Sequence, residues 1–138
     1  MTLAERRQRE KDRRRDDIIS AASRLFSKKG YERVSMEEIA NEVELSKSTL
    51  YFYFKDKESL FFAVVNHGTR IFRSIVQEEE AKMQTAGIEA GVTKIACERF
   101  VLEYPDYAGA YLCFRSGKFE FLDDAGMSAD AKQVFEFT

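Results

Sequence analysis

The chain has 138 residues, of which 44% are apolar and one is proline, and its formal net charge is −2. The length suits one domain, or one small domain with part of a second, and the composition is typical of a folded helical protein. No stretch approaches the roughly 20 apolar residues of a membrane span, and the N-terminus is charged, unlike a secretory signal. We therefore expect an all-α, cytoplasmic protein that does not contact membranes.

The chain is poor in the residues that build metal sites and catalytic centres. His67 is the single histidine, and Cys97 and Cys113 are the two cysteines. One histidine cannot make a metal cluster, and two thiols in a cytosolic helical protein are usually buried and reduced. The sequence has no glycine-rich phosphate loop and no nucleophile motif. We predict no catalytic residues, no metal and no cofactor, and therefore a protein that is not an enzyme.

Charge is distributed unevenly along the chain. Residues 1–60 hold 14 lysines and arginines against 12 acidic residues, whereas residues 61–138 hold 8 against 12. A basic first part joined to an acidic second part is typical of a DNA-binding head with a body that does not touch DNA. Seven cations crowd one short stretch: Arg6, Arg7, Arg9, Lys11, Arg13, Arg14 and Arg15. A nucleic-acid-binding arm and a solvated charge run explain that stretch equally well.

The first predicted helix covers residues 13–29. Ile18, Ala22 and Phe26 recur at helical spacing, so they share one face that we expect to be buried. Gly30 follows where a left-handed cap requires glycine.

Two serine caps mark the next two helices. Ser35 begins a short helix that ends near Val43, and its hydroxyl forms a predicted capping box with Glu38. Ser46 begins a third helix that runs to Tyr53.

Asp56 caps a fourth helix that is predicted to reach about Thr85. Its inward apolar stripe is the longest in the chain: Leu60, Phe61, Val64, Val65, Gly68, Ile71, Phe72, Ile75 and Val76. Because Glu78, Glu79 and Glu80 are consecutive, they splay around the helix, and we interpret them as a solvated face.

Two further helices are predicted after Gly87. The fifth covers residues 88–104, with Ile95 on its inward face, and Pro105 ends it. The sixth covers residues 106–116. Ser128 is the predicted cap of a last helix.

The two short helices within residues 35–53 fit a helix-turn-helix. In that motif the first helix crosses the DNA backbone, and the second enters the major groove with its N-terminal residues toward the base edges. Lys47, Ser48 and Thr49 form the polar tip that such a helix needs, and Leu50 lies on its apolar back. The helix starts also present N–H groups that suit phosphate.

The residues of this segment resemble the head of TetR-family repressors. The agreement covers about residues 13–62 and rests on these positions: Leu25, Phe26, Gly30, Tyr31, Ile39, Ala40, Ser46, Leu50, Tyr51, Tyr53, Phe54, Lys57 and Leu60. The resemblance implies a three-helix DNA-binding head joined by a long fourth helix to a helical ligand-binding and dimerisation body. We divide the chain accordingly into a flexible basic arm (1–12), the head (13–56) and the body (57–138).

The resemblance also implies roles for individual residues. Lys47, Ser48 and Tyr51 are expected to read base edges. The residues expected to contact or pack against the DNA backbone are Ser35, Ser46, Thr49, Phe52, Tyr53 and Lys57. Arg13, Arg14 and Arg15 are expected to reach along or into the minor groove. Where the family turn usually has glycine this chain has Glu44, which implies a left-handed glutamate at a cost of about 1 kcal/mol.

Aromatic residues are frequent in the second part of the chain. Ordinary core packing explains many of them, and an apolar ligand cavity beside the fourth helix is the alternative. The candidate lining residues are Phe100, Tyr104, Tyr107, Tyr111 and Phe114. The expected occupant is a small apolar or aromatic effector.

Together these observations predict a ligand-responsive repressor that binds a palindromic operator in double-stranded DNA as a homodimer. The alternative is a shortened or partial homologue that acts as a weak DNA-binding or partner-binding module without its own dimer interface.

Overall fold

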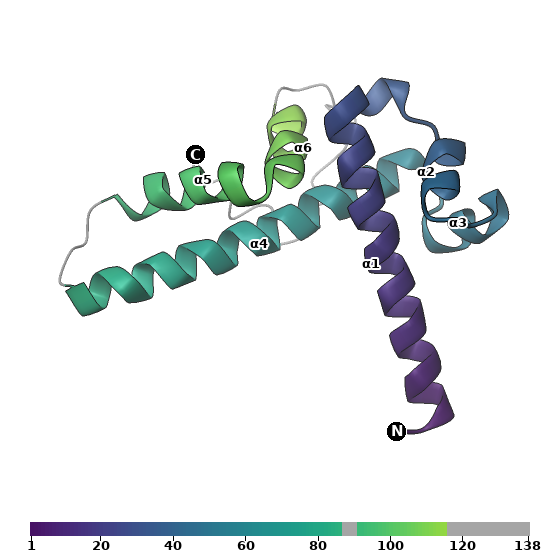
Figure 1. The fold of residues 1–138 in the computed structure, drawn as a ribbon, viewed down its shortest axis with the longest axis horizontal. Helices are drawn as coiled ribbons and strands as arrows, with labels where there is room; N and C mark the ends of the chain where they lie inside the picture. Colours follow the sequence, from purple (N-terminus) through teal and green to yellow (C-terminus); the bar gives the residue numbers. More distant parts are fainter. Residues whose placement is uncertain (87–90, 116–138) are drawn as a thin grey trace. The chain divides into compact units, whose positions relative to one another are not determined.

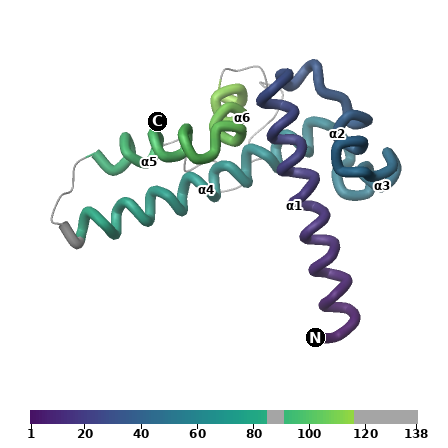
Figure 2. Tube along the Cα trace, viewed as in Figure 1, coloured from purple at the N-terminus to yellow at the C-terminus, as the bar shows by residue number. Residues whose placement is uncertain are grey.

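The computed structural model describes residues 1–86 and 91–115, and every regular element in these ranges is helical (Figures 1 and 2). The elements are α1 (Leu3–Lys29), the 3-10 turn η1 (Tyr31–Arg33), α2 (Met36–Glu42), α3 (Lys47–Tyr53), α4 (Lys57–Ala86), α5 (Val92–Glu103) and α6 (Pro105–Arg115). The predicted all-α class is confirmed. None of the helices in these ranges is long and apolar enough to cross a membrane. The chain divides into two compact units, residues 1–64 and 65–138.

Helix α1 begins at Leu3, well before the start predicted at residue 13. The Thr2 hydroxyl accepts a hydrogen bond from the Glu5 N–H at 3.2 Å, and the Glu5 carboxylate accepts one from the Thr2 N–H at 3.0 Å. This capping box satisfies the first orphan N–H groups and sets the helix start. The arginine-rich stretch, which we expected to be a flexible arm, is therefore the exposed first half of α1.

The second half of α1 packs into unit 1 as its periodicity predicts. Ile18, Ala22 and Phe26 are buried on one face. The helix ends at Gly30, whose N–H donates to the Phe26 carbonyl at 2.9 Å. Gly30 has φ 86° and ψ 154°. The positive φ is as predicted, but the ψ is extended instead of left-handed helical, a region open essentially to glycine alone.

The predicted capping box of α2 is only half formed. The Ser35 hydroxyl accepts the Glu38 N–H at 3.1 Å, as expected. The Glu38 carboxylate, however, pairs with the Lys29 ammonium at the end of α1, and this hydrogen bond lowers the pKa of Glu38. The Lys29 ammonium offers this carboxylate a donor of opposite charge, whereas the backbone N–H of Ser35 is neutral. The carboxylate therefore ties α2 to α1.

The turn between α2 and α3 contains the expected left-handed glutamate. Glu44 has φ 57°, the one positive φ among the described residues other than glycine. The turn is closed by the Leu45 N–H, which donates to the Ala40 carbonyl at 2.9 Å. Glu44 is exposed, and its backbone is strained by the left-handed conformation.

We expect Glu44→Gly to raise the stability of the head by about 0.5–1 kcal/mol, because relief of the left-handed strain exceeds the entropy that glycine adds to the unfolded chain. Urea unfolding followed by circular dichroism measures this. Glu42→Gly is the matched control: Glu42 is exposed and ends α2, so glycine there should cost about 0.5 kcal/mol. Equal shifts for the two variants would contradict the assignment of strain to Glu44.

The start of α4 completes the core of unit 1. Asp56 caps it as predicted, because its carboxylate accepts the Ser59 N–H at 2.7 Å. Phe61 is 1% exposed, and its ring lies 5.4 Å from Phe26 and 5.2 Å from Tyr31, edge to face in both cases. This aromatic cluster joins α4, α1 and η1, and it fixes the platform from which α2 and α3 are presented.

Unit 2 has its own core, built by one face of α4 with α5 and α6. Phe72, Ile75, Ala96, Phe100 and Ala108 are buried together in it. The remaining part of the inward stripe of α4 thus packs as the periodicity predicts.

Gly68 lets α6 approach α4 closely. A Cβ at this position would lie 3.2 Å from the Tyr107 Cβ and 3.6 Å from the Phe100 ring. The Tyr107 ring also lies 5.1 Å from the His67 ring. A larger residue at this crossing would need Tyr107 to shift by a few tenths of an ångström, so glycine is favoured here for steric reasons and not for its φ, which is ordinary.

Helices α5 and α6 differ from the prediction at their junction. Ala96 and Phe100 are buried, but Ile95, which we expected on the inward face of α5, is 37% exposed. Pro105 does follow the end of α5, and it also opens α6, at a position where the missing N–H removes no helical bond. Predicted features at Gly87, Ile88, Ser116, Gly117 and Ser128 lie outside the described residues.

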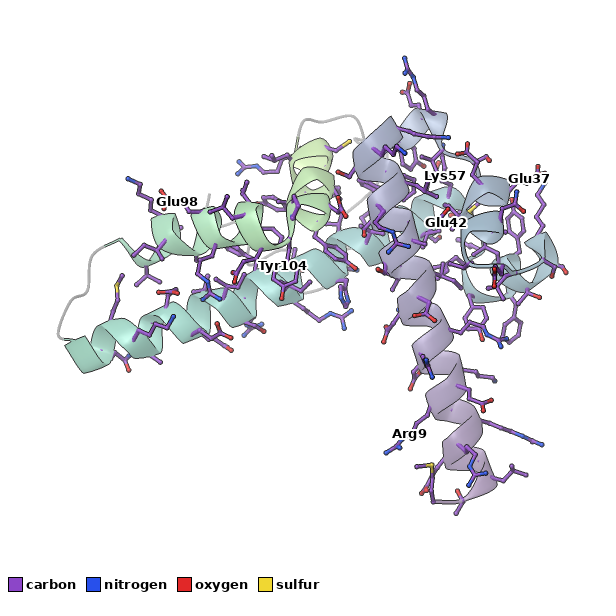
Figure 3. The ribbon with its side chains drawn as sticks, viewed as in Figure 1. Arg9, Glu37, Glu42, Lys57, Glu98 and Tyr104 are labelled. Carbon is purple, nitrogen blue, oxygen red and sulfur yellow. The ribbon has the colours of Figure 1, made fainter. Side chains whose placement is uncertain are left out.

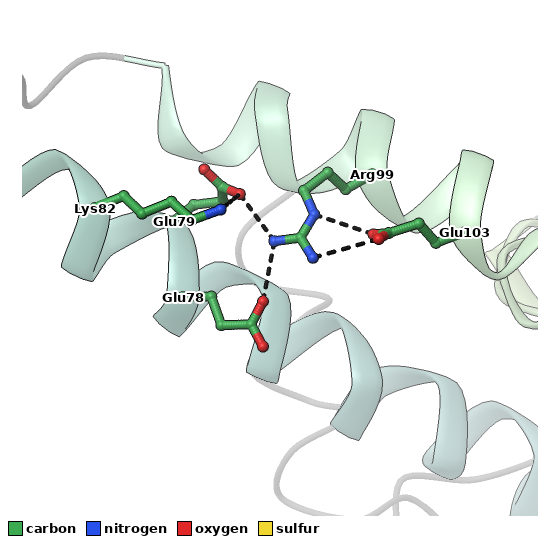
Figure 4. Close-up of polar contacts among 5 residues, drawn as sticks. All are labelled: Glu78, Glu79, Lys82, Arg99 and Glu103. Carbon is green, nitrogen blue, oxygen red and sulfur yellow. Dashed lines mark hydrogen bonds and ion pairs between the residues drawn. The ribbon is translucent and has the colours of Figure 1, made fainter.

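One ion-pair cluster joins α4 to α5 (Figure 4). The Arg99 guanidinium donates to Glu79 at 2.8 Å, to Glu78 at 3.0 Å and to Glu103 at 3.0 Å. Lys82 adds a second cation on Glu79 at 3.2 Å, and these bonds lower the pKa of the Glu79 carboxyl. The expectation of a solvated acidic face is therefore wrong for Glu79, which is 7% exposed.

Candidate nucleic-acid interface

The N-terminal end of α3 is polar and exposed. Ser46 caps it: its hydroxyl accepts the Thr49 N–H at 3.2 Å and lies 2.8 Å from the Thr49 hydroxyl. Lys47 and Ser48 follow at the exposed tip. The Ser46 and Thr49 hydroxyls thus hold the helix start in place, and the adjacent tip is available to a ligand.

Helix α3 has one buried side, which anchors it to the head, and one exposed side. Leu50 is 0% and Phe54 is 5% exposed, so these two side chains fix the helix to the head. Tyr51 is 42% exposed, and it follows Lys47 by four residues and Ser48 by three, which places all three on one face. The residues predicted to read bases therefore share a single exposed surface.

Lys57 and Ser35 are both engaged within the head. The Lys57 ammonium donates to the Tyr31 carbonyl at 2.8 Å and lies 4.2 Å from the centre of the Tyr31 ring. Ser35 caps α2 with its hydroxyl. An ammonium has three donors, so Lys57 keeps donors for a phosphate while it orders η1.

Tyr31 is held in its neutral form by this environment. Burial first, and then the negative charges of Glu58 and Asp56, raise the pKa of its hydroxyl to about 12. The unfolded hydroxyl ionises near its ordinary pKa of about 10. The folded state therefore binds more protons than the unfolded state above pH 10, and stability falls as the pH rises from 10 through 12.

We expect Tyr31→Phe to lose this part of the pH dependence, because phenylalanine has no hydroxyl to ionise. Urea unfolding of the two proteins at pH 9 and pH 11 measures it: the wild type should lose more stability over this interval than the variant. Lysines also titrate in this range in both proteins. The test is therefore the difference between the two proteins in the change of unfolding free energy with pH. Identical slopes would refute the assignment to Tyr31.

The three arginines predicted as an arm face different directions along α1. The Arg15 guanidinium lies 5.0 Å from the centre of the Phe54 ring. Arg14 lines a hollow of about 310 Å³ together with residues of α3. Arg13 lines a separate hollow, together with several acidic residues of α1. Arg7 and Lys11 share the first hollow with Arg14 and precede it at helical spacing, although neither was among the three arginines predicted to contact DNA.

Unit 2 contains an apolar cavity of about 220 Å³. Its walls come from α4, α5 and α6: Thr69, Phe72, Cys97, Phe100, Val101, Ala108, Tyr111, Leu112 and Arg115. Burial raises the pKa of the Cys97 thiol, so this wall carries no thiolate at neutral pH.

Two of the five candidate lining residues, Phe100 and Tyr111, are on this wall. Tyr107 packs against Gly68, Tyr104 is 40% exposed and Phe114 is buried away from the cavity wall. Three of the missed lining residues follow helical spacing from the correct ones: Cys97 precedes Phe100 by three residues, Ala108 precedes Tyr111 by three, and Arg115 follows Tyr111 by four. Aromatic content alone did not reveal these three.

A short capped helix, a turn with a left-handed residue and a second capped helix with a polar tip define the first unit as a helix-turn-helix DNA-binding domain. A sequence model of the family described as "Bacterial regulatory proteins, tetR family" matches residues 18–64. This match assigns the DNA-binding head of the chain to the TetR family of bacterial regulatory proteins.

Named relatives agree with this assignment. The HTH-type transcriptional repressor NicS of Pseudomonas putida is 31% identical over 99 residues, which are 71% of this chain and 44% of NicS. The uncharacterized HTH-type transcriptional regulator YuxN of Bacillus subtilis is 44% identical over 50 residues, which are 36% of this chain and 17% of YuxN. The chain thus matches less than half of the length of either relative.

A solved structure shares the fold. The crystal structure of a gamma-butyrolactone receptor, an ArpA-like protein, superposes with a TM-score of 0.58 over 78% of this chain and 55% of that one, at 24% sequence identity.

Proposed function

We propose that this chain is a transcriptional repressor that binds a palindromic operator as a homodimer and releases it when a small effector binds. The observation that carries the proposal is the exposed face of α3, where Lys47, Ser48 and Tyr51 lie together while Leu50 and Phe54 anchor the helix from behind. A recognition helix needs this combination, since its tip must reach base edges while its back stays fixed.

The groups around α3 suit the DNA backbone. Phosphate contacts position a head without reading sequence, and we assign them to Lys57, to the start of α2 at Ser35, and to Thr49 and Tyr53 on α3. Phe52 has no donor, so we assign it to packing against the sugars of the backbone. Phe52 is 71% exposed although it is fully apolar, which supports a surface that is covered in a complex.

The apolar cavity of unit 2 supports an effector role for that unit. A dry cavity of roughly 150 Å³ is enough to hold benzene, so 220 Å³ admits a small aromatic or short aliphatic molecule. An effector acts only through a difference in affinity between two states. We propose that it binds the conformation with low affinity for operator DNA.

Selection of bound sequences from randomised duplexes, followed by fluorescence anisotropy, tests the proposal. We expect enrichment of a palindrome whose half-sites are about 10–10.5 base pairs apart, one helical turn. Release by members of an aromatic and aliphatic compound panel then tests the effector role. A selection without any enriched sequence would refute operator binding.

Sedimentation separates this proposal from the alternative of a partner-binding module without its own dimer interface. A dimer at micromolar concentration supports the repressor. A strict monomer that enriches only a half-site supports the alternative.

A further inference from the structure

The exposed first half of α1 carries its charges on separate faces. Arg7, Lys11, Arg14 and Arg15 fall within about 100° of arc at 3.6 residues per turn, and three of them line the hollow beside α3. The acidic residues of this segment lie outside that arc: Glu5, Glu10, Asp12, Asp16 and Asp17. Glu10 also lines the hollow, where three cations outnumber it.

The other wall of the hollow is the side of α3 that we assign to the DNA backbone. It consists of Thr49, Phe52 and Tyr53. The Lys11 ammonium lies 5.8 Å from the centre of the exposed Phe52 ring, within reach of a cation–π contact. Arg15, one residue after Arg14, stacks on the Phe54 ring and so joins this part of α1 to the end of α3. The hollow thus combines hydroxyls, an apolar ring and cations, the groups that bind phosphate and sugar.

We propose that Arg7, Lys11 and Arg14 form a second DNA contact, a rigid helical clamp that binds successive phosphates of one strand beside the groove entered by α3. Arg7 and Arg14 are seven residues apart, so the clamp spans about 10 Å at 1.5 Å per residue. One strand presents a phosphate about every 3.4 Å along the duplex axis, so this length covers about three phosphates.

This clamp differs from a minor-groove arm in what it reads. Its cations sit on a folded helix, which cannot thread into a groove only about 6 Å wide, and phosphates carry no direct sequence information. The clamp therefore adds affinity for any duplex, whereas the exposed face of α3 supplies discrimination. The inference rests on the proposed function, because it assumes that α3 docks on duplex DNA.

The opposite face of the same helix provides a matched control. Arg6, Arg9 and Arg24 are exposed and are turned by roughly 130° from the clamp. Arg6 and Arg9 line a hollow with Asp12, Asp16 and Asp17. Arg9 points away from the side of α1 on which α3 lies (Figure 3). Neutralising either set of three changes the net charge equally, so only the position of the charges differs between the two variants.

The test compares R7Q/K11Q/R14Q with R6Q/R9Q/R24Q in the full chain. Affinity for a random-sequence 30-base-pair duplex and for the selected operator is measured by anisotropy between 50 and 300 mM KCl. Because each phosphate contact contributes about 0.9 to the slope of log K against log salt, the clamp variant should lose about 3 from the magnitude of the slope per head. Its affinity for both duplexes should fall by the same factor, and the control should keep the wild-type slope.

Glutamine is a good helix former, and far-UV circular dichroism verifies that both variants retain α1. Equal losses of slope in the two variants would overturn the clamp, as would a clamp variant with an unchanged slope. A loss confined to the operator would assign these residues to sequence recognition instead, and would also refute the proposal. Failure of the proposed function has a different signature, since the wild type would then not discriminate operator from random DNA.

Discussion

The double substitution Lys47→Ala/Tyr51→Ala is expected to abolish discrimination between operator and random DNA. Each side chain that binds a specific base provides about 1–3 kcal/mol of discrimination, so each of the two truncations should lower operator affinity roughly 10- to 100-fold. Affinity for random duplexes should fall much less, and only through the single charge removed from Lys47. Anisotropy titration against both duplexes at one salt concentration measures the ratio.

The control for this pair is Lys94→Ala/Tyr104→Ala on unit 2. Both residues are exposed, and the change removes the same two side-chain types far along the chain from α3. The control should bind the operator like the wild type. If the α3 variant also retained wild-type discrimination, another surface would have to read the bases.

Phe61→Ala is expected to destabilise the head by about 3–5 kcal/mol, the usual cost of removing a fully buried phenylalanine. Phe61 is 1% exposed and makes edge-to-face contacts with Phe26 and Tyr31. Removal of the ring uncouples α4 from α1 and η1, so the variant should also bind DNA more weakly. Chemical unfolding followed by circular dichroism at 222 nm provides the free energy.

Phe52→Ala is the matched control for stability. Phe52 is 71% exposed, so its removal should change the free energy of unfolding by no more than about 0.5 kcal/mol. A comparable loss of stability in both variants would mean that the aromatic cluster around Phe61 does not hold the head together.

Local signals made much of the head predictable. Ser35, Ser46 and Asp56 each accept a backbone N–H three residues ahead, and all three mark the helix starts that they predict. The left-handed turn at Glu44 followed from the resemblance. These features depend on a few neighbouring residues, which is why the sequence reveals them.

Interactions between distant residues were not predictable in the same way. Glu38 had a local partner in the predicted capping box, and Lys29 from another helix competes for it successfully. Glu79 was predicted to be one of three solvated acids, but in the fold Arg99, 20 residues later, lies beside it. Which of several possible partners a charged side chain takes depends on how the helices pack.

The start of α1 was missed for a different reason. The signal was local, a Thr2 and Glu5 capping box, but a run of arginines with few apolar residues has no periodic stripe to reveal a helix. The cavity of unit 2 was predicted only in part, since aromatic content pointed to Phe100 and Tyr111 but could not show which neighbours share their wall.

The continuity of α1 from Leu3 to Lys29 also constrains how its sequence can change in length. Each inserted residue turns everything before it by about 100° relative to the buried face that begins at Ile18. A single insertion between Arg15 and Ile18 would rotate the cations away from α3, whereas seven inserted residues, close to two full turns, would nearly restore their direction. Related chains that keep the clamp should therefore vary in composition across residues 3–17 far more readily than in the spacing from Arg14 to Ile18.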